Sequence, residues 1–313
     1  MRMMRIRRFG VVVAVLGLLM AGCGNDGDTG DDGETVTGSF VDQIKEDGEI
    51  VVGVKFDVPQ FGFRNPSTDE VEGFDPDMGR AVAEELGVEA RFVEALSANR
   101  IPFLQEDKVD VVFSTMTIND ERKKQIDFST VYYVAQQSFL TRKGETMTVE
   151  SAAGKKICTA KGSTSELNLP ALQPEAEMVL QDGYAQCVQL LSNEQVDAVT
   201  TDDVILLQFV QKDPDAFEVS EETFSTEPYG AGIKKGREDL VELVDGVIND
   251  MKEDGRWADL YEKWITPVTG EDAPEPPTGD EEFEIEGLDA PVTPSPTPAG
   301  SPANGSPAAT ASP

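Results

Sequence analysis

The sequence contains no histidine, only three cysteines, and 26 basic against 59 acidic side chains in 313 residues, for a net charge of −33. Without histidine the chain lacks the commonest general base and the commonest metal ligand of proteins. Zinc proteases and histidine-dependent triads and dyads are therefore excluded. The acidic balance also argues against a nucleic acid partner, whose binding proteins present basic surfaces. We expect neither a metal ion nor another cofactor.

The first 39 residues have the composition of an export signal followed by a tether. Four arginines precede an uncharged run over residues 9–22, which predicts a signal peptide over residues 1–22 and is too short to span a bilayer. The run ends in Leu-Met-Ala-Gly-Cys and resembles the bacterial lipobox, which implies that Cys23 carries a lipid anchor at the outer face of the cell membrane. The alternative is plain cleavage, with Cys23 as a structural thiol. Residues 23–39, rich in Gly, Asp and Thr, predict a flexible tether.

The C-terminus has the composition of a disordered segment. From about Glu271 it holds nine acidic residues and no Lys or Arg, and it then consists of Pro, Ser, Thr and Ala repeats. Such a composition cannot bury enough apolar surface to offset the entropy of ordering. We therefore predict disorder over residues 269–313, which leaves a folded core of about residues 40–270.

The core alternates strand and helix patterns. Apolar runs such as residues 50–54 predict buried strands, and a helix is expected over residues 75–86 with Asp75 as its N-cap. Alternation of this kind is typical of βαβ units in a mostly parallel sheet. The segment Lys-Val-Asp-Val-Val around Asp110 is echoed by Gln-Val-Asp-Ala-Val around Asp197. We interpret this repeat as two similar lobes, although buried parallel strands often carry such a pattern.

The order of the elements predicts that the chain crosses twice between the lobes. Lobe 1 comprises residues 40–136 and 229–268, and lobe 2 comprises residues 137–228. Two crossings form a two-strand hinge, and the cleft between hinged lobes is a ligand site.

Cys158 falls on a predicted strand of lobe 2 and Cys187 on a predicted helix of the same lobe. In an exported, oxidising context a disulfide between them is feasible.

A series of motifs follows in order along the core. They are Gly53-Val-Lys-Phe-Asp-Val-Pro59, Gly73-Phe-Asp-x-Asp77, Ala98-Asn-Arg-Ile-Pro102, Met116-Thr-Ile-Asn-Asp-Glu-Arg122, Asp127-Phe-Ser-x-x-Tyr-Tyr133, Lys161-Gly-Ser-Thr-Ser-Glu166, Thr201-Asp202, Tyr229-Gly230 and Asp254-Gly-x-Trp-x-x-Leu-Tyr-x-Lys-Trp264. Together they resemble the polar amino acid-binding proteins of ABC importers, solute-binding protein family three, over about residues 48–267. The resemblance implies a two-lobed, type II periplasmic-binding-protein-like α/β fold and no enzymatic activity. It also implies a free amino acid as ligand, an ABC permease with its ATPase as partners, and a monomer.

The residues expected to bind the ligand come from both lobes. They are Lys55, Phe61, Arg100, Ser114, Thr117, Arg122, Ser163, Thr164, Asp202 and Tyr229. A free amino acid is a zwitterion, and the fork of Arg122, close to a helix start capped by Asn119, suits its α-carboxylate. Ser163 and Thr164 open a helix in the other lobe and would offer N–H and hydroxyl donors.

Asp202 ends the repeated strand of lobe 2, at the edge where ligands bind in open α/β sheets. With Thr117 and the Ser114 carbonyl it is expected to hold the α-ammonium. Most of the candidate residues also have a simpler structural interpretation. Arg122 could form a surface ion pair with Glu121 or Asp127. Asp202, Ser163 and Thr164 could each cap a helix. The aromatic residues that would line the pocket could instead be core residues, namely Phe61, Phe63, Tyr133 and Tyr229.

Lys55 and Arg100 bear on the choice of ligand. Their positions match those that contact the side-chain carboxylate in aspartate- and glutamate-binding relatives, and a desolvated carboxylate needs a cation. The resemblance thus predicts glutamate or aspartate, with glutamine as the alternative. A cyclohexadienyl-dehydratase-like lyase on the same fold would need a carboxylate such as Glu166 or Asp202 as acid or base. A sensor that feeds a separate receptor is the third class.

Overall fold

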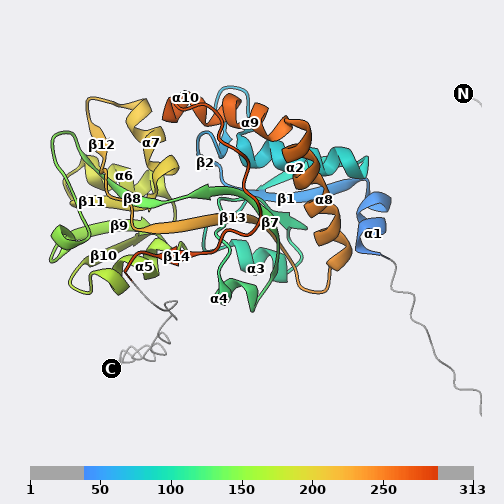
Figure 1. Cartoon of the computed structure of the whole chain (residues 1–313), viewed down its shortest axis with the longest axis horizontal. Helices are drawn as coiled ribbons and strands as arrows, with labels where there is room; N and C mark the ends of the chain where they lie inside the picture. The colour runs from blue at the N-terminus through green and yellow to red at the C-terminus, as the bar shows by residue number, and fades with distance from the viewer. Residues whose placement is uncertain (1–38, 288–313) are drawn as a thin grey trace, which may run out of the picture. The chain divides into compact units, whose positions relative to one another are not determined.

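The computed structural model describes residues 39–287 (Figure 1). The predicted signal peptide, the predicted lipid-attachment residue Cys23, nearly all of the predicted tether and the tail from residue 288 onward lie outside the described residues. Within residues 39–287, no helix is both long enough and apolar enough to cross a membrane.

The first sheet has six strands, in the spatial order β14-β13-β6-β1-β5 with β7 also paired to β13. The strands are β1 (Glu49–Val54), β5 (Glu89–Glu94), β6 (Val111–Val112), β7 (Asp127–Ala135), β13 (Ser225–Ile233) and β14 (Glu284–Ile285). Strand β1 is parallel to β5 and β6, whereas β13 is antiparallel to β6, β7 and β14. Helices cover both faces (Figure 1): α2 (Phe74–Leu86), α8 (Glu238–Asp254) and α9 (Arg256–Trp264) on one, α3 (Arg100–Gln105) and α4 (Asp120–Lys123) on the other. Helix α1 (Phe40–Asp47) packs against α2 and α8.

The second sheet has five strands in the order β10-β9-β11-β8-β12. They are β8 (Gln137–Arg142), β9 (Lys156–Ala160), β10 (Glu177–Gln181), β11 (Ala198–Asp202) and β12 (Phe217–Val219). Strand β9 is parallel to β10 and β11, and β8 is antiparallel to β11 and β12. The flanking helices are α5 (Ser165–Leu172) on one face, α6 (Tyr184–Ser192) and α7 (Asp203–Lys212) on the other, and a short 3₁₀ helix η1 (Glu150–Ala152) precedes β9.

Neighbouring residues of one strand enter different cores, because side chains alternate across a sheet. On β1, Val52 and Val54 join the core beneath α2 and α8, while Val51 joins the core beneath α3. On β9, Ile157 faces α5 and Cys158 faces α6 and α7. Each lobe is therefore a helix–sheet–helix unit. The apolar layer beneath α2 and α8 continues into lobe 2 through Ala160, Tyr184, Val204 and Ile205.

The repeated aspartates occupy equivalent positions in the two sheets. Asp110 precedes β6 and its carboxylate accepts a 2.8 Å bond from the backbone N–H of Val51 on β1. Asp197 precedes β11 and its carboxylate accepts a 2.8 Å bond from the backbone N–H of Lys156 on β9. Each aspartate thus ties the start of one parallel strand to its neighbour, which is the physical basis of the sequence repeat.

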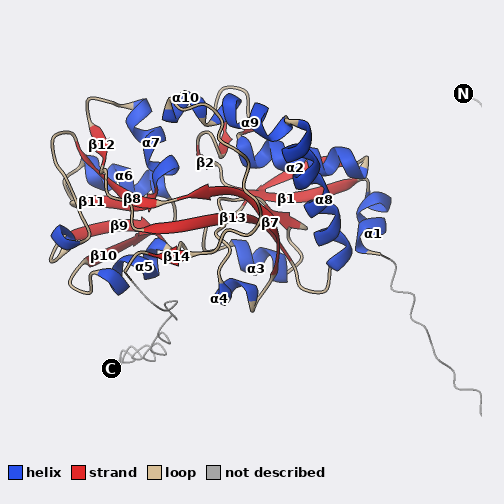
Figure 2. Ribbon diagram, in the orientation of Figure 1, coloured by secondary structure: helices blue, strands red, loops and turns tan. Residues whose placement is uncertain are grey.

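Two strands join the lobes. The chain leaves the first sheet at the end of β7, and β8 of the second sheet begins two residues later at Gln137. It returns along β13, which lies antiparallel to β7 (Figure 2). At the crossing, the N–H of Gln137 donates to the Ser225 hydroxyl and the N–H of Phe224 donates to the Gln137 carbonyl. The fold is the predicted two-lobed α/β architecture with a two-strand hinge.

A disulfide joins Cys158 of β9 to Cys187 of α6 within lobe 2. Both cysteines are fully buried, in the apolar layer between the second sheet and helices α6 and α7. The bond that the sequence made feasible is therefore present.

Asp75 is not the N-cap of α2, contrary to the sequence-based expectation. Gly73 occupies that position, and the carboxylate of Asp75 lies buried inside the first turn. It accepts hydrogen bonds from the Thr115 N–H at 2.9 Å and the Tyr132 hydroxyl at 2.7 Å. The donors to this carboxylate come from distant parts of the chain, so a local capping pattern cannot predict them.

A small sheet of β2 (Asp57–Val58), β3 (Gly62–Arg64) and β4 (Val71–Glu72) precedes α2.

The acidic segment after α10 (Thr266–Thr269) differs from the expectation of disorder. Residues 270–287, here called the C-terminal strap, end in β14 beside the start of β13. Ile285 is buried opposite Ser225, and the N–H of Glu286 donates to the Phe224 carbonyl. One buried side chain and a few backbone bonds order the segment, although its average composition is that of a disordered chain.

Candidate functional site

All of the charged side chains that are buried within residues 39–287 belong to one cluster. They are Lys55, Asp75, Arg100, Arg122, Asp202 and Glu227. The guanidinium groups of Arg100 and Arg122, in lobe 1, both donate to the carbonyl of Gly162 in lobe 2, at 3.2 and 3.1 Å. Removing an ion from water costs several kcal/mol unless it is well paired. A cluster of buried charges where two lobes meet is therefore a candidate functional site.

The carboxyl ends of the parallel strands bring these groups together. Lys55 follows β1, Ser114 follows β6, Gly162 follows β9, and Asp202 is the last residue of β11. In open α/β sheets this edge is where ligands bind. The equivalent edges of both sheets thus face one junction, which accounts for contributions from distant parts of the chain.

Arg122 is held at the start of a short helix, and Asn119 caps that helix as predicted. The Asn119 side-chain oxygen accepts the N–H of Arg122 at 2.9 Å. The guanidinium donates to the Thr117 carbonyl at 2.7 Å and to Gly162, which leaves three of its five N–H donors for another partner. Burial lowers the pKa of Arg122 to about 9, and the nearby charge of Arg100 acts in the same direction.

Arg122 does not make the surface ion pair that was its structural alternative. Glu121 pairs with Lys124 at 2.5 Å, and Asp127 pairs with Lys235 at 2.9 Å. The guanidinium is buried and turned toward lobe 2.

Arg100 is bound almost completely by backbone carbonyls. It donates to Ser97, Ser114, Thr115 and Gly162 at distances between 2.9 and 3.2 Å. One N–H donor remains, so Arg100 chiefly holds the loop after β6 against lobe 2. The Ser114 carbonyl, which was expected to bind the α-ammonium, accepts one of these bonds.

Lys55 retains more freedom to bind a ligand. Its ammonium donates to the Ser97 hydroxyl at 2.8 Å and lies 5.5 Å from the ring centre of Tyr184, on α6 of the other lobe. Burial lowers the pKa of Lys55 to about 7, with a further contribution from Arg100. An ammonium has three donors, and the described contacts use one.

Asp202 stands at the N-cap position of α7, but its side chain does not cap that helix. The carboxylate instead accepts a short hydrogen bond from the Tyr229 hydroxyl. Burial raises the pKa of Asp202 well above its ordinary value, and the nearby carboxylate of Glu227 adds to this. Because burial and the charge of Glu227 disfavour its ionised form, a cationic partner such as an ammonium group would stabilise the Asp202 carboxylate.

Ser163 and Thr164 differ in their roles. The Ser163 hydroxyl accepts the Glu166 N–H at 3.3 Å, the bond expected of a helix cap. The Thr164 hydroxyl donates to Glu227 at 2.8 Å and accepts from Gln137 at 2.8 Å. Its single hydroxyl proton is thus used within the protein, which leaves the backbone N–H as the donor that Thr164 would offer to a ligand.

The aromatic candidates form a buried cluster beside the charges. The Phe61 ring centre lies 5.1 Å from that of Tyr133 and 5.8 Å from that of Tyr229. Phe61 and Tyr229 are fully buried, whereas Phe63 is partly exposed. Tyr229 therefore belongs both to this apolar cluster and, through its hydroxyl, to the charge cluster.

Three residues of the junction were missed by sequence reasoning. Tyr184 lies beneath the Lys55 ammonium, and Asp57 of lobe 1 accepts the N–H of Tyr184 at 3.2 Å, at the start of α6. Glu227 accepts hydrogen bonds from both lobes. The one signal for Glu227 was a charged residue within the otherwise uncharged strand β13.

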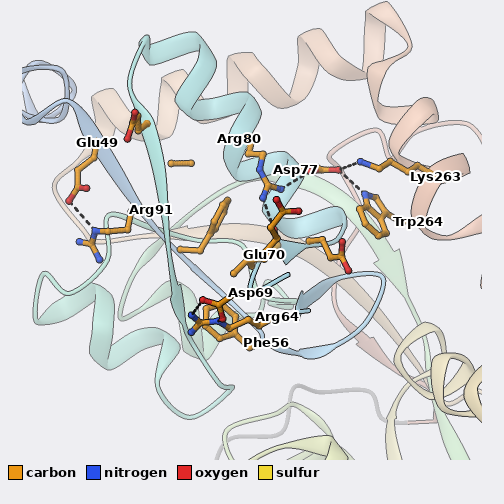
Figure 3. Close-up of a pocket in the computed structure, with 15 residues that line it drawn as sticks. Glu49, Phe56, Arg64, Asp69, Glu70, Asp77, Arg80, Arg91, Lys263 and Trp264 are labelled. Atoms are coloured by element: carbon orange, nitrogen blue, oxygen red, sulfur yellow. Dashed lines mark hydrogen bonds and ion pairs between the residues drawn. The ribbon is translucent and has the colours of Figure 1, made fainter. Parts of the chain in front are cut away.

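A hollow of about 870 Å³ lies on lobe 1, away from the buried charge cluster (Figure 3). Its basic side chains are already paired, Arg64 with Asp69, Arg91 with Glu49, and Arg80 and Lys263 with Asp77. Several of these pairs are largely exposed, and exposed ion pairs contribute little to stability. Asp77 also accepts the Trp264 ring N–H, so it mainly links α2 to α9.

Two α/β lobes that are joined by two strands and share a buried charge cluster define the class of two-lobed binding proteins. Residues 50–267 match the bacterial extracellular solute-binding proteins, family 3. The chain belongs to this family.

The relatives include binding proteins for different amino acids. The chain is 40% identical to the ABC transporter glutamine-binding protein GlnH of Bacillus subtilis (strain 168), over 79% of this chain and 92% of the relative. It is 30% identical to the glutamate-binding protein GluB of Corynebacterium efficiens, over 73% and 81% of the two chains. The solved structure of an ancestral arginine-binding protein bound to glutamine is 37% identical, with a TM-score of 0.67 over 70% of this chain and 98% of that one.

Proposed function

We propose that this chain is the binding component of an ABC importer, which holds a free polar amino acid between its lobes and delivers it to a permease and its ATPase. The single observation that carries the proposal is the confinement of the buried charges, within residues 39–287, to the junction of the lobes. A zwitterion brings both an anion and a cation to such a cluster. The names of the relatives support an amino acid as ligand.

In the proposed arrangement the free donors of Arg122 bind the α-carboxylate, with help from the backbone near Ser163. Asp202 and the Thr117 oxygen accept the α-ammonium. Phe61 and Tyr229 flank the carbon skeleton, and Lys55 donates to the polar end of the ligand side chain. Arg100, Ser114 and Thr164 shape the site through their bonds within the protein. The proposal is supported by the donors that Arg122 and Lys55 retain.

For the side chain we propose glutamine first and glutamate second. The prediction of an acidic ligand rested on two cations, but backbone carbonyls already engage Arg100. The glutamine-binding relative is also more similar than the glutamate-binding one.

We further propose that residues 1–22 are a signal peptide and that Cys23 carries a lipid, so that residues 23–39 tether a monomer to the outer face of the cell membrane. The proposed lobes are residues 40–136 with 229–268, and residues 137–228. The sequence patterns described above support these assignments.

The proposal is tested by calorimetric titration of the purified chain with glutamine, glutamate, asparagine and aspartate. We expect glutamine to bind most tightly. Lys55→Met should weaken binding of glutamine and glutamate by at least tenfold, because a hydrogen bond to a charged group contributes about 1.5–3 kcal/mol. Lys161→Met removes an exposed lysine that pairs with Asp182 and serves as the control.

Two results would contradict the proposal in different ways. If none of the four amino acids binds, the assignment as an amino acid-binding protein is wrong. If Lys55→Met leaves the affinities for glutamine and glutamate unchanged, Lys55 does not contact the ligand side chain. Turnover of prephenate or arogenate would instead support the lyase alternative, and we expect none.

A further inference from the structure

Glu227 lies on β13, one of the two strands that join the lobes, and it is fully buried. Its carboxylate is the meeting point of several hydrogen bonds. One oxygen accepts from the hydroxyls of Thr117 at 2.5 Å and Thr164 at 2.8 Å. The other accepts from the Ser225 hydroxyl at 2.9 Å and the Asn168 side-chain amide at 3.1 Å. An ionised carboxylate has about four acceptor positions, so this arrangement uses its capacity fully.

These donors come from both sides of the junction. Thr117 belongs to the loop between β6 and α4 in lobe 1, whereas Thr164 and Asn168 belong to the start of α5 in lobe 2. The same carboxylate oxygen therefore binds one hydroxyl from each lobe. Any rotation that separates the lobes must lengthen at least one of these bonds. Charge-assisted hydrogen bonds are roughly twice as strong as neutral ones, so their loss on opening is costly.

The carboxylate also decides which way the two hydroxyls point. A hydroxyl has one proton, and both Thr117 and Thr164 direct theirs to Glu227. Thr117 then presents only lone pairs to other groups, which makes it an acceptor suited to an ammonium. Thr164 is held from its other side by the Gln137 side chain. A neutral group at residue 227 would leave the direction of these protons unspecified.

We propose that Glu227 is a positioning residue for ligand binding, which orients Thr117 of lobe 1 toward the ligand ammonium and connects it to Thr164 of lobe 2 when the lobes close. The inference rests on the proposed function, because it assigns a role at the same site. Asp202 and Arg122 are the charged neighbours of Glu227, the first repelling and the second stabilising its charge.

The test is a double-mutant cycle on the full chain with Glu227→Gln and Thr164→Val, titrated with L-glutamine and L-glutamate well below the melting temperature. The amide of Glu227→Gln has the size of the carboxylate, but its NH₂ group would face hydroxyl or amide groups that donate to Glu227 in the unmodified chain. We expect each single variant to bind at least tenfold more weakly, mainly through faster dissociation, and the double variant to bind no more weakly than Glu227→Gln. Such non-additivity shows that the two residues act together.

Lys161→Met is the control, because it removes an exposed lysine that pairs with Asp182 and leaves the Glu227 hydrogen bonds in place. We expect less than a threefold change in affinity. If Glu227→Gln does not fold, Thr117→Val and Thr164→Val carry the test, since each keeps the carboxylate and removes one hydroxyl. Glu227→Asp, which retains the charge, should recover part of the affinity.

The outcomes separate this inference from the proposed function. Binding by the unmodified chain together with wild-type affinity in Glu227→Gln would overturn the inference alone. Additive losses in the cycle would also overturn it, because Glu227 would then act independently of Thr164. Failure of the unmodified chain to bind any of the amino acids would overturn both.

Discussion

Lys55 and Asp75 lie in the same buried cluster, and both have a pKa of about 7. In each case burial is the main cause, because it penalises the charged form. Arg100 acts on both, lowering the pKa of Lys55 and opposing the rise at Asp75. A site with two such groups changes its number of bound protons near neutral pH, which makes its stability sensitive to pH.

Asp75→Asn tests this sensitivity. Asp75 has a pKa of about 7 in the folded chain against an ordinary 3.8, so the folded state holds the proton more tightly than the unfolded state. The free energy of unfolding should therefore fall as pH rises from about 4 to about 7, by at most about 4 kcal/mol. The amide of the variant does not titrate, so the decline should be smaller in the variant by the contribution of Asp75 when unfolding by denaturant is followed across the window.

Glu85→Gln is the control for that experiment, because Glu85 is exposed on the same helix α2. It should retain the decline of the unmodified chain. Lys55 acts in the opposite sense, adding stability as pH rises from about 7 toward 10.5. Asp202 and Glu227 also have raised pKa values, but their effect is common to both chains, so the difference between Asp75→Asn and the unmodified chain below pH 7 reports Asp75. An identical pH profile for Asp75→Asn and the unmodified chain would refute the assignment.

At the residue scale the sequence could predict which side chains meet, but not how their hydrogen bonds are used. Asn119 capping the helix of Arg122 is a local pattern, and it was predicted correctly. The engagement of Arg100 by carbonyls and of Thr164 by Glu227 involves residues far apart in the chain. Such bonds depend on tertiary geometry, which periodicity and spacing do not encode.

At the scale of elements, the Cys158–Cys187 disulfide joins strand β9 to helix α6. The cysteines of the disulfide are 29 residues apart. A crosslink of this span lowers the entropy of the unfolded chain and is worth about 3–4 kcal/mol in the loop-closure treatment. Since both sulfurs lie in the apolar layer of lobe 2, the effect belongs to that lobe.

Replacing both cysteines, as Cys158→Ala with Cys187→Ala, should reduce the unfolding free energy by about 3–4 kcal/mol. Hydrogen exchange should become faster in β9, β10 and β11 than in the unmodified chain. The first sheet provides an internal control, because β1 and β5 do not contact the disulfide. Equal acceleration in both sheets would contradict a stabilising effect confined to lobe 2.

The buried strands and amphipathic helices of both sheets could be predicted, because apolar runs and helical periodicity are properties of short segments. The strand β14 could not. Its prediction as part of a disordered tail rested on composition averaged over residues 269–313, whereas the structure needs only Ile285 and a few backbone bonds. The position of Asp57 and the small sheet β2-β3-β4, in which it lies, likewise depend on packing against other elements.

For the molecule as a whole, the contacts between the lobes describe a closed arrangement. Gly162 accepts from two arginines of lobe 1, and Asp57 accepts from the start of α6. Each of these bonds would break if the lobes rotated apart about β7 and β13. A ligand that contacts both lobes would favour the closed arrangement by its differential affinity for it.

Small-angle X-ray scattering tests this expectation. We expect a smaller radius of gyration with saturating glutamine than without it, because closure brings the lobes together. Asp202→Asn, which lacks the carboxylate proposed to hold the ammonium, should show no change on adding glutamine. An unchanged radius in the unmodified chain, at a concentration where calorimetry shows binding, would rule out closure of this kind.

The C-terminal strap has a practical consequence for any shortened version of the protein. The match to the family ends at residue 267, before the strap begins. A chain cut there would keep both sheets but would lose β14, leaving the backbone of β13 at Ser225 and Thr226 without its partner. An open strand edge is a template for another chain to add a strand. The protein trimmed to the family boundary would therefore be prone to self-association through the very strand on which its hinge depends.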